Sequence, residues 1–520
     1  MNAATRKRRI RWMLAIVALL IVVVAPPQVD SIDAKVRLDV ARSLLWRSSI
    51  AIEPPAYHAV LAPAGIDERH YAIYPLGQTL LFLPLESAAE GLVQSARVAG
   101  WHGTEAAAVY LKDAVIAGIY LLTVNVLLAL ALFKLQRKLG LSSRSAAIGV
   151  LALLLCTQWL TWGRSMQEEA LAALLLCTAA CAGLDAARSV KLLRNALWFG
   201  ACMGMLANVR YNGVFAAAAL CLWTGIALSG TRNRLVFAAF SLASVAPWLC
   251  MAGWYNHARF GGVLRSGYHA AMQQGRISSW SFDVVEFSEL LAGSNYGLLY
   301  FWLPAVLLFA GWRGRGVFRS GVAIVGTALI LHLVFLAGIY VWARGEGCTG
   351  PRFVCHHLML LGPFMWIGTL RIWRNWPAAR PVVVAALAFS MAVQLSCVLF
   401  TGELENMQRK ARLAAGLETE PEGALPLRFA NVLRLADGTL SDYSYPPSLG
   451  QRNVNQFAPE SFEVATRPNL TPFRVSGGIR ARTSLPEWVA TVAWCIWSAA
   501  AIALVACAVR FGYVLNPGSP

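Results

Sequence analysis

Long apolar runs recur along the whole chain and are separated by short polar segments. A window of about 20 apolar residues is long enough to cross a bilayer as a helix. Such windows lie near residues 10–26, 106–133, 145–161, 169–187, 195–210, 212–229, 234–254, 296–311, 320–342, 353–371, 381–400 and 487–514. The pattern therefore predicts an all-α polytopic membrane protein with about twelve transmembrane helices.

Polar segments divide the chain into three parts. We expect a transmembrane module over residues 1–400, with outer loops at 27–105 and 255–295. The first loop contains TLLFLPLESAAEGLVQSARV, a pattern typical of a helix lying in the membrane interface. Residues 401–486 are polar and rich in Pro, Gly and Asn, and apolar residues alternate in FANVLRLADGTLS. This segment is expected to form a small α+β or β-containing outer domain. The last transmembrane helix and a cytoplasmic tail follow at 487–520.

Composition and charge agree with a membrane protein. The chain is 57% hydrophobic and only 14% charged, which excludes an ordinary soluble protein. Its net charge of +18 is concentrated in alternate loops, as the positive-inside rule expects, so it does not indicate nucleic acid as a partner. The start RKRRIRW and the apolar run after it predict a retained signal anchor with a cytoplasmic N-terminus. The acids gather in the opposite loops, so we expect the working face outside the cytoplasm.

The stretch VDSIDAKVRLDVARSLL directly follows the first apolar run. Strict alternation in IDAKVRLDV is a strand signal, but it fails towards its end, so a helix is the competing interpretation. On a helical wheel, Lys35, Asp39 and Arg42 share a polar face, whereas Asp33 and Arg37 fall on an otherwise apolar face. A partly buried carboxylate beside an arginine is held ionised and oriented, as a general base must be. An ion pair that only steadies an interfacial helix is the alternative.

Further motifs follow in order along the chain. They are HYAIYPLGQTLLFLPLE in the first loop, WGRSMQEEALAALLL at the outer start of the fourth span, WYNHARFGGVLRSGY in the second loop, and EGCTGPRF. Together with Asp33, which precedes an Ala-Arg pair by a few residues, they resemble motifs of GT-C membrane glycosyltransferases of the family 39 type. These include protein O-mannosyltransferases and lipid A aminoarabinose transferases. In that family a second acid usually follows the first, where this chain has Ala34. The resemblance covers roughly residues 1 to 375.

The resemblance implies that a hexosyl or pentosyl group is transferred from a polyprenyl-phosphate carrier to a lipid, glycan or protein acceptor. The reaction would take place on the periplasmic face of a bacterial inner membrane. It needs a carboxylate for the acceptor hydroxyl and cations for the lipid phosphate. The candidate catalytic acids are Asp33, Glu168 and Glu169. The phosphate-binding candidates are Arg37, Arg259, Arg265 and Arg352. The sugar or acceptor pocket is expected to include Tyr74, Tyr268 and Arg210.

Partners and alternatives follow from the same observations. We expect no tightly bound cofactor, because the lipid-linked donor replaces a nucleotide sugar, and a divalent-metal requirement stays open. The adjacent residues His356 and His357 point to different helix faces, so no metal site is expected there. Two alternatives remain: a transporter or flippase, which would need charged residues near mid-span, and a non-catalytic partner of the same fold in polysaccharide assembly.

Overall fold

The described part of the chain is almost entirely helical. Its only strand pairing consists of two isolated bridges, which join Ile52 and Ala64 to His70 in the first outer loop. The computed structural model describes residues 3–26, 28–29, 31–53, 61–229, 233–275, 280–293, 297–306, 317–339, 352–400, 404, 408, 424–440, 468–470, 472, 475 and 487–515.

Seven helices in these residues are long and apolar enough to cross a bilayer. They are α4 (Glu105–Lys138), α7 (Glu169–Ala187), α10 (Arg234–Phe260), α15 (Val317–Ala337), α17 (Cys355–Asn375), α18 (Arg380–Leu399) and α25 (Glu487–Leu515). The protein is therefore a multi-pass membrane protein. Four more of the predicted runs hold helices that are shorter or carry more polar residues: α1 (Ala3–Val24), α5 (Ser143–Cys156), α8 (Leu192–Val209) and α9 (Val214–Ala227). In the predicted run 296–311, the described residues form only short turns, α13 (Leu298–Phe301) and η3 (Leu303–Val306).

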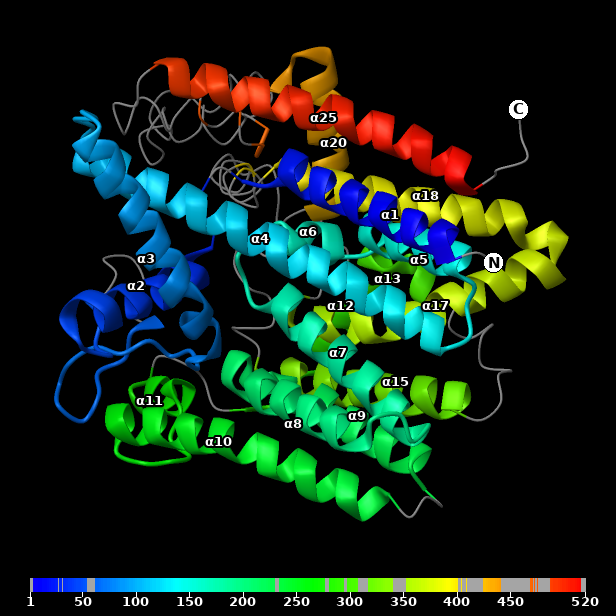
Figure 1. Ribbon diagram of the computed structural model, residues 1–520, viewed down its shortest axis with the longest axis horizontal. Helices are drawn as coiled ribbons and strands as arrows, with labels where there is room; N and C mark the ends of the chain where they lie inside the picture. The colour runs from blue at the N-terminus through cyan, green and yellow to red at the C-terminus, as the bar shows by residue number, and fades with distance from the viewer. Residues whose placement is uncertain are drawn as a thin grey trace.

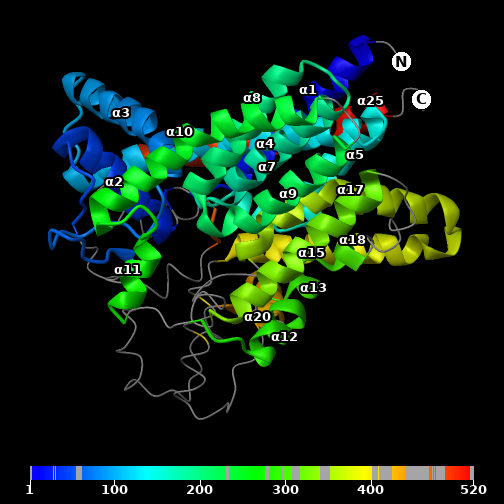
Figure 2. The same ribbon diagram turned by 90° about the horizontal axis from the view of Figure 1, so that it is seen from below.

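The chain termini lie at one end of the helical bundle, and the helices of the outer loops lie at the other. The long helices lie side by side along one axis, and both chain termini lie at one end (Figure 1). At the other end lie α2 (Ile32–Arg47), α3 (Gly77–Val98) and α11 (Gly267–Gln273). Seen after a quarter turn, α12 (Val284–Ala292) and α20 (Ala424–Asp437) project from one side of the bundle (Figure 2).

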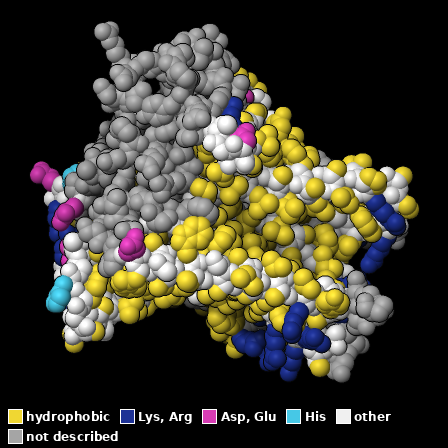
Figure 3. Space-filling view, turned by 90° about the horizontal axis from the view of Figure 1, so that it is seen from above, with side chains coloured by type: hydrophobic (Ala, Val, Ile, Leu, Met, Phe, Trp, Pro, Cys, Tyr) yellow, Lys and Arg dark blue, Asp and Glu magenta, His cyan; other side chains and the backbone are white. Residues whose placement is uncertain are grey.

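The described helices on the face seen in Figure 3 are largely apolar, and most of the basic side chains on this face gather at the end that holds the termini. Helix α10, for example, leaves Leu235, Leu242 and Leu249 exposed, which is tolerable only against lipid. A groove at the basic end is lined by Arg6, Lys134, Arg137, Lys138, Arg188 and Arg194. One basic end is what the positive-inside rule predicts for the cytoplasmic side.

Two local predictions from alternating residues are resolved by the structure. Residues 32–47 form helix α2, so the helical interpretation of that stretch is confirmed. Helix α20 covers most of 429–441, whose alternating apolar residues supported the expectation of an α+β or β-containing domain. In α20, Leu427, Arg428 and Asn431 are buried at helical spacing, which places them on one face. The rest of the predicted outer domain lies largely outside the described residues.

Close packing of α8 against α10 supports the side of the bundle beneath the outer loops. Ser241 and Ser244 of α10 donate hydrogen bonds from their hydroxyls to the carbonyls of Ala196 and Leu197, at 3.1 and 2.8 Å. Gly200 leaves room for this approach, because a β-carbon there would lie 2.1 Å from the carbonyl oxygen of Ser241. Small residues at such contacts let helix backbones approach closely in membranes.

We expect Gly200→Ala to lower the free energy of unfolding by about 1–3 kcal/mol, since the added methyl group overpacks the α8–α10 contact. The matched control is Gly118→Ala on α4, where a β-carbon meets nothing within 4 Å. That control should be neutral or slightly stabilising, because glycine is unfavourable in a helix interior. Thermal unfolding in detergent measures both variants, and equal midpoints would contradict the packing.

Candidate active site

Three arginines and three carboxylates form one continuous ion-pair chain at the α2 end of the bundle. Glu169 accepts hydrogen bonds from Arg352 Nε at 2.8 Å and from Arg210 Nη1 at 2.7 Å. Glu168 lies 2.8 Å from Arg37 and 3.4 Å from Arg210. Arg352 also donates through Nη2 to Asp33. The formal charges of these six side chains cancel, as buried charges require. In order, the members are Asp33, Arg352, Glu169, Arg210, Glu168 and Arg37.

Tyr74 joins the two ends of this chain. Its hydroxyl donates a 2.5 Å hydrogen bond to Asp33 Oδ1, and the Arg37 guanidinium lies 3.9 Å from the centre of its ring. The seven side chains therefore form a closed ring of contacts, which we call the ion-pair ring.

The members of the ion-pair ring come from helix ends and breaks. Asp33 lies in the first turn of α2, and Glu169 is the first residue of α7. Arg352 belongs to a 3₁₀ turn, η4 (Arg352–Val354), which runs directly into α17. Arg210 has an extended backbone between α8 and α9. Carboxylates in the first turn of a helix are stabilised by its dipole. The order of helix starts thus places acids and arginines together.

Buried amides hold the segment that carries Glu168. Asn125 on α4 donates to the carbonyl of Gly163 at 2.6 Å, and Gln78 on α3 donates to that of Met166 at 2.7 Å. Gln167 in the same segment donates to the Ser31 hydroxyl at 3.0 Å, just before α2. The first two bonds satisfy backbone carbonyls between α6 (Trp159–Gly163) and α7, and all three hold the segment that carries the two glutamates.

Asp33 is the most accessible member of the ring. Its side chain is 18% exposed, compared with 0% for Glu169 and 6% for Glu168. Burial raises the pKa of the Asp33 carboxyl, but the positive charges of Arg352 and Arg37 and the Tyr74 hydrogen bond outweigh it and lower the pKa to about 2. Burial and the Asp33 charge raise the pKa of the Tyr74 hydroxyl well above its usual value, so it stays a donor. Asp33 is thus an ionised, oriented acceptor.

A cavity of about 470 Å³ adjoins the ring. Arg37, Glu168 and Arg210 line its polar end, and Tyr268 lines it too, edge-to-face with Tyr211 at 5.9 Å. Its other walls are largely apolar and come from α8, α9, α11, α15 and the loops beside them. They include Val209, Phe215, Met272, Trp280, Phe335 and Leu336. A charged end with apolar walls fits an amphiphile that has an anionic headgroup.

Two of the predicted phosphate-binding arginines lie outside the ion-pair ring. Arg259 is fully buried and donates to the carbonyls of Tyr255 and Tyr74 at 3.0 and 3.3 Å, and also to that of Ala72. It thereby holds the segment that carries Tyr74. Arg265 is exposed on the following loop.

The environment of α2 differs in two ways from the helical-wheel expectation. Arg37 pairs with Glu168 instead of its neighbour Asp33. Arg42, expected on a charged outer face, lies 3.2 Å from the buried Glu86 and 2.7 Å from Asp113. Both faces of α2 are therefore anchored by partners from other helices.

The position that carries a second acid in the family is part of the core in this chain. Ala34 is fully buried and belongs to the main apolar cluster, so a carboxylate at this position would lie among apolar side chains. The acids nearest Asp33 in the ring come from the start of α7 instead.

Sequence analysis missed several residues around this site. Phe215 and Phe335, which wall the cavity, resemble ordinary core aromatics in the sequence. His332, which stacks on Phe215 with ring centres 4.9 Å apart, did carry a signal. It is the only Asp, Glu, Lys, Arg or His between Arg319 and Arg344, and such a residue within a transmembrane run is a functional-site hypothesis by default.

Comparison with known proteins gives a likeness of fold. No protein-family model and no curated protein matches the sequence. The crystal structure of ArnT from Cupriavidus metallidurans bound to undecaprenyl phosphate is similar, with a TM-score of 0.50, 14% identity, and coverage of 99% of this chain and 78% of ArnT. The apo state gives a TM-score of 0.49 and 13% identity at the same coverage. The chain has the fold of GT-C membrane glycosyltransferases.

A weaker likeness extends to an archaeal protein. The apo oligosaccharyltransferase of Archaeoglobus fulgidus has a TM-score of 0.47 and 12% identity, over 85% of this chain and 60% of that one. In the GT-C fold of the present chain, the ion-pair ring lies where α2, α7 and α17 begin.

We expect Glu169→Gln to destabilise the protein by about 3–5 kcal/mol, because it leaves the buried Arg210 and Arg352 without their shared carboxylate. The control is Glu53→Gln, whose carboxylate is 90% exposed and pairs with Arg47 at the surface. A surface pair contributes about 0–1 kcal/mol. Unfolding in detergent compares the two variants, and a similar small loss in both would show that the ring is not a structural unit.

Proposed function

We propose that this protein is a membrane glycosyltransferase that moves a sugar from a polyprenyl-phosphate carrier to a hydroxyl acceptor. The proposal rests on one observation, which is that the ion-pair ring lies directly beside the apolar cavity. A closed ring of buried arginines and carboxylates, with Asp33 as its most accessible acid, adjoins an apolar-walled cavity. The GT-C fold supports the proposal, and one structure with this fold, ArnT, holds undecaprenyl phosphate.

The cavity is the proposed donor site. Aromatic and aliphatic walls from α9, α11 and α15 suit the first isoprene units of the carrier, because apolar surface buried there leaves water. The phosphate would lie at the polar end, beside Arg210. Arg210 donates hydrogen bonds from Nε to Asn212 at 2.6 Å and from Nη1 to Glu169 at 2.7 Å. Its Nη2 makes no hydrogen bond to a described residue, which leaves it for a phosphate oxygen.

Arg352 is the proposed second phosphate ligand. Its guanidinium lies 5.3 Å from the ring of Phe353, which lines the cavity, and it also bonds to Asp33. A phosphate that draws Arg352 towards itself weakens the Arg352–Asp33 pair. The pKa of Asp33 then rises, which makes the carboxylate a stronger base when the donor is bound.

Asp33 is the proposed general base. The acceptor hydroxyl gives its proton to the Asp33 carboxylate while its oxygen bonds to the anomeric carbon. The bond between that carbon and the phosphate oxygen breaks, and the phosphate leaves with the electron pair, which gives inversion. Tyr74 and Arg37 orient the base, and Glu168 and Glu169 position the arginines.

We extend the proposal to the orientation of the chain. The basic groove at the end with the termini supports a cytoplasmic N-terminus and twelve spans in all, with the ion-pair ring on the periplasmic face of a bacterial inner membrane. The acceptor would then be a lipid, glycan or protein of the cell envelope, lipopolysaccharide included.

Asp33→Asn should lower sugar transfer by about 10²–10⁴-fold, the usual contribution of general acid–base catalysis. The matched control is Asp39→Asn on the same helix, whose carboxylate is 43% exposed. The assay compares lipid-linked sugars and surface glycans, by mass spectrometry, in a deletion strain complemented with each variant. Full transfer by a folded Asp33→Asn protein would overturn the catalytic role and favour a transporter or a non-catalytic partner.

Arg352→Lys should weaken binding of undecaprenyl phosphate roughly 10-fold or more, because a hydrogen bond to a charged group contributes about 1.5–3 kcal/mol. Lysine keeps the charge but loses the planar fork that reaches two partners. Arg265→Lys, at an exposed position outside the ring, is the control and should bind as the parent does. Binding is measured by native mass spectrometry, and equal affinity in the two variants would remove Arg352 from the phosphate site.

A further inference from the structure

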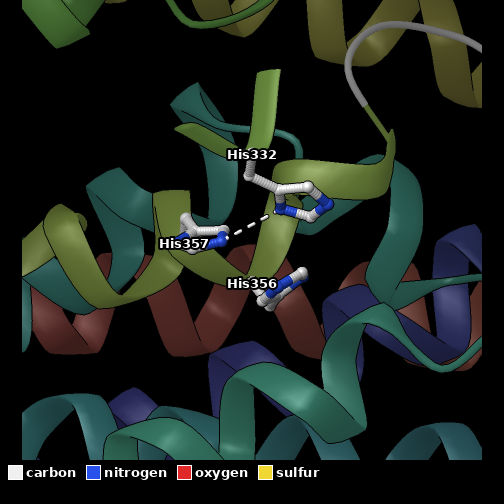
Figure 4. A group of neighbouring side chains, drawn as sticks. All are labelled: His332, His356 and His357. Carbon is white, nitrogen blue, oxygen red and sulfur yellow. Dashed lines mark hydrogen bonds between the residues drawn. The ribbon is translucent and has the colours of Figure 1, made fainter. Parts of the chain in front are cut away.

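Three histidines meet inside the bundle, next to the cavity but outside the ion-pair ring. His332 comes from the middle of α15, and His356 and His357 come from the first turn of α17 (Figure 4). All three side chains are fully buried. Although adjacent residues usually diverge on a helix, the rings of His356 and His357 lie with centres 4.6 Å apart. His332 contributes the third ring, from a helix that is distant from this pair in the sequence.

The polar atoms of this cluster lack sufficient partners among the described residues. His332 Nδ1 lies 3.1 Å from His357 Nε2, the one hydrogen bond within the group. Neither nitrogen of His356 has a hydrogen-bond partner in the described structure, and His332 Nε2 and His357 Nδ1 also lack one. A buried polar group without a partner costs about 1–3 kcal/mol. Four such nitrogens at one point in an apolar interior indicate a ligand that binds imidazole.

The spacing of these nitrogens suits a single metal ion. One ligand nitrogen from each histidine lies within 4.8 Å of the other two. In a tetrahedral site with metal–nitrogen bonds of about 2.0–2.1 Å, ligand nitrogens lie about 3.3 Å apart. The 3.1 Å distance between His332 and His357 already meets this value. The other nitrogen pairs need to close by at most about 1.5 Å, a movement within reach of a rotation of the His356 side chain.

We propose that His332, His356 and His357 bind one first-row transition-metal ion of the zinc class. Three neutral imidazoles are a recognised ligand set for zinc, with a fourth position left for water or another group. Imidazole also suits copper, iron and nickel, whereas magnesium and calcium require oxygen ligands. The site is distinct from the carboxylates of the ion-pair ring, and its assignment is independent of the proposed transferase activity.

The position of the cluster defines what the metal does. It joins α15 to α17 on either side of residues 340–351, and His356 lies one helical turn after Arg352. The Phe215 ring stacks on His332 and lines the cavity, so an aromatic side chain stands between the histidines and the cavity. The metal is therefore a clamp that fixes the start of α17, and through it the guanidinium of Arg352.

Metal content measures this site directly. The full-length chain, purified in detergent, is stripped with a chelator and titrated with zinc, and bound metal is counted by elemental mass spectrometry. The parent should bind one zinc per chain, and zinc should raise its unfolding temperature. His332→Leu and His357→Leu should each weaken binding by at least the roughly 100-fold that loss of an outer-shell partner can cost. The matched control is His257→Leu, at an exposed position on α10.

Cobalt provides a second readout. Cobalt(II) in place of zinc should show the strong visible absorption of tetrahedral coordination in the parent and in His257→Leu, but not in the other two variants. The proposal is overturned if the parent binds no metal after titration, or if His332→Leu and His357→Leu retain the parent's zinc. Should those variants fail to fold, the parent alone decides. A chelator must then remove one metal ion from the parent and lower its unfolding temperature. The site is rejected if neither the chelator nor added zinc changes the unfolding temperature of the parent.

Discussion

The ion-pair ring is the constraint on which the rest of this structure depends. Five of its six charged side chains are buried in an apolar bundle and Asp33 is only partly exposed, and an unpaired charge there is far more costly than in water. Each member therefore has to meet a partner of opposite sign, and those partners belong to different helices. Meeting this condition fixes where α2, α7 and α17 begin and where the chain breaks between α8 and α9. Tyr74 closes the ring between Asp33 and Arg37.

In the proposed function, a lipid donor and a polar acceptor meet at the ion-pair ring. Its arginines and Glu168 end an apolar cavity, while Asp33 keeps part of its surface accessible. Because the formal charges cancel, the anionic donor proposed above would alter the balance and draw arginines from their carboxylates. The low pKa of Asp33 thus depends on the charges of Arg352 and Arg37 beside it. The buried histidines lie behind Phe215, which lines the same cavity, and two of them belong to the first turn of α17.

Sequence patterns predicted some parts well for physical reasons. Apolar runs found the long helices, because bilayer thickness sets a minimum length. The wheel separated Asp33 and Arg37 from the outer face of α2, since helical periodicity is local. Alternation alone did not distinguish a strand from helix α20, because a short amphipathic segment can fit both periodicities. Arg259 and Arg265 were predicted to bind phosphate together with Arg352, because all three are arginines expected on the same side of the membrane. Residue type and membrane side do not tell how far apart the side chains lie.

The sequence by itself determined the membrane class, the long helices, the basic end and the set of charged residues available for chemistry. These follow from composition and local periodicity. Only the tertiary structure decided which charges meet. Arg352 bonds to Asp33, which lies 319 positions away in the sequence. Arg37 pairs with Glu168 and not with Asp33, its neighbour on α2. Likewise, His332 joins His356 and His357 only because α15 packs on α17. Such partners depend on how helices are placed in space, and a linear pattern does not encode that distance.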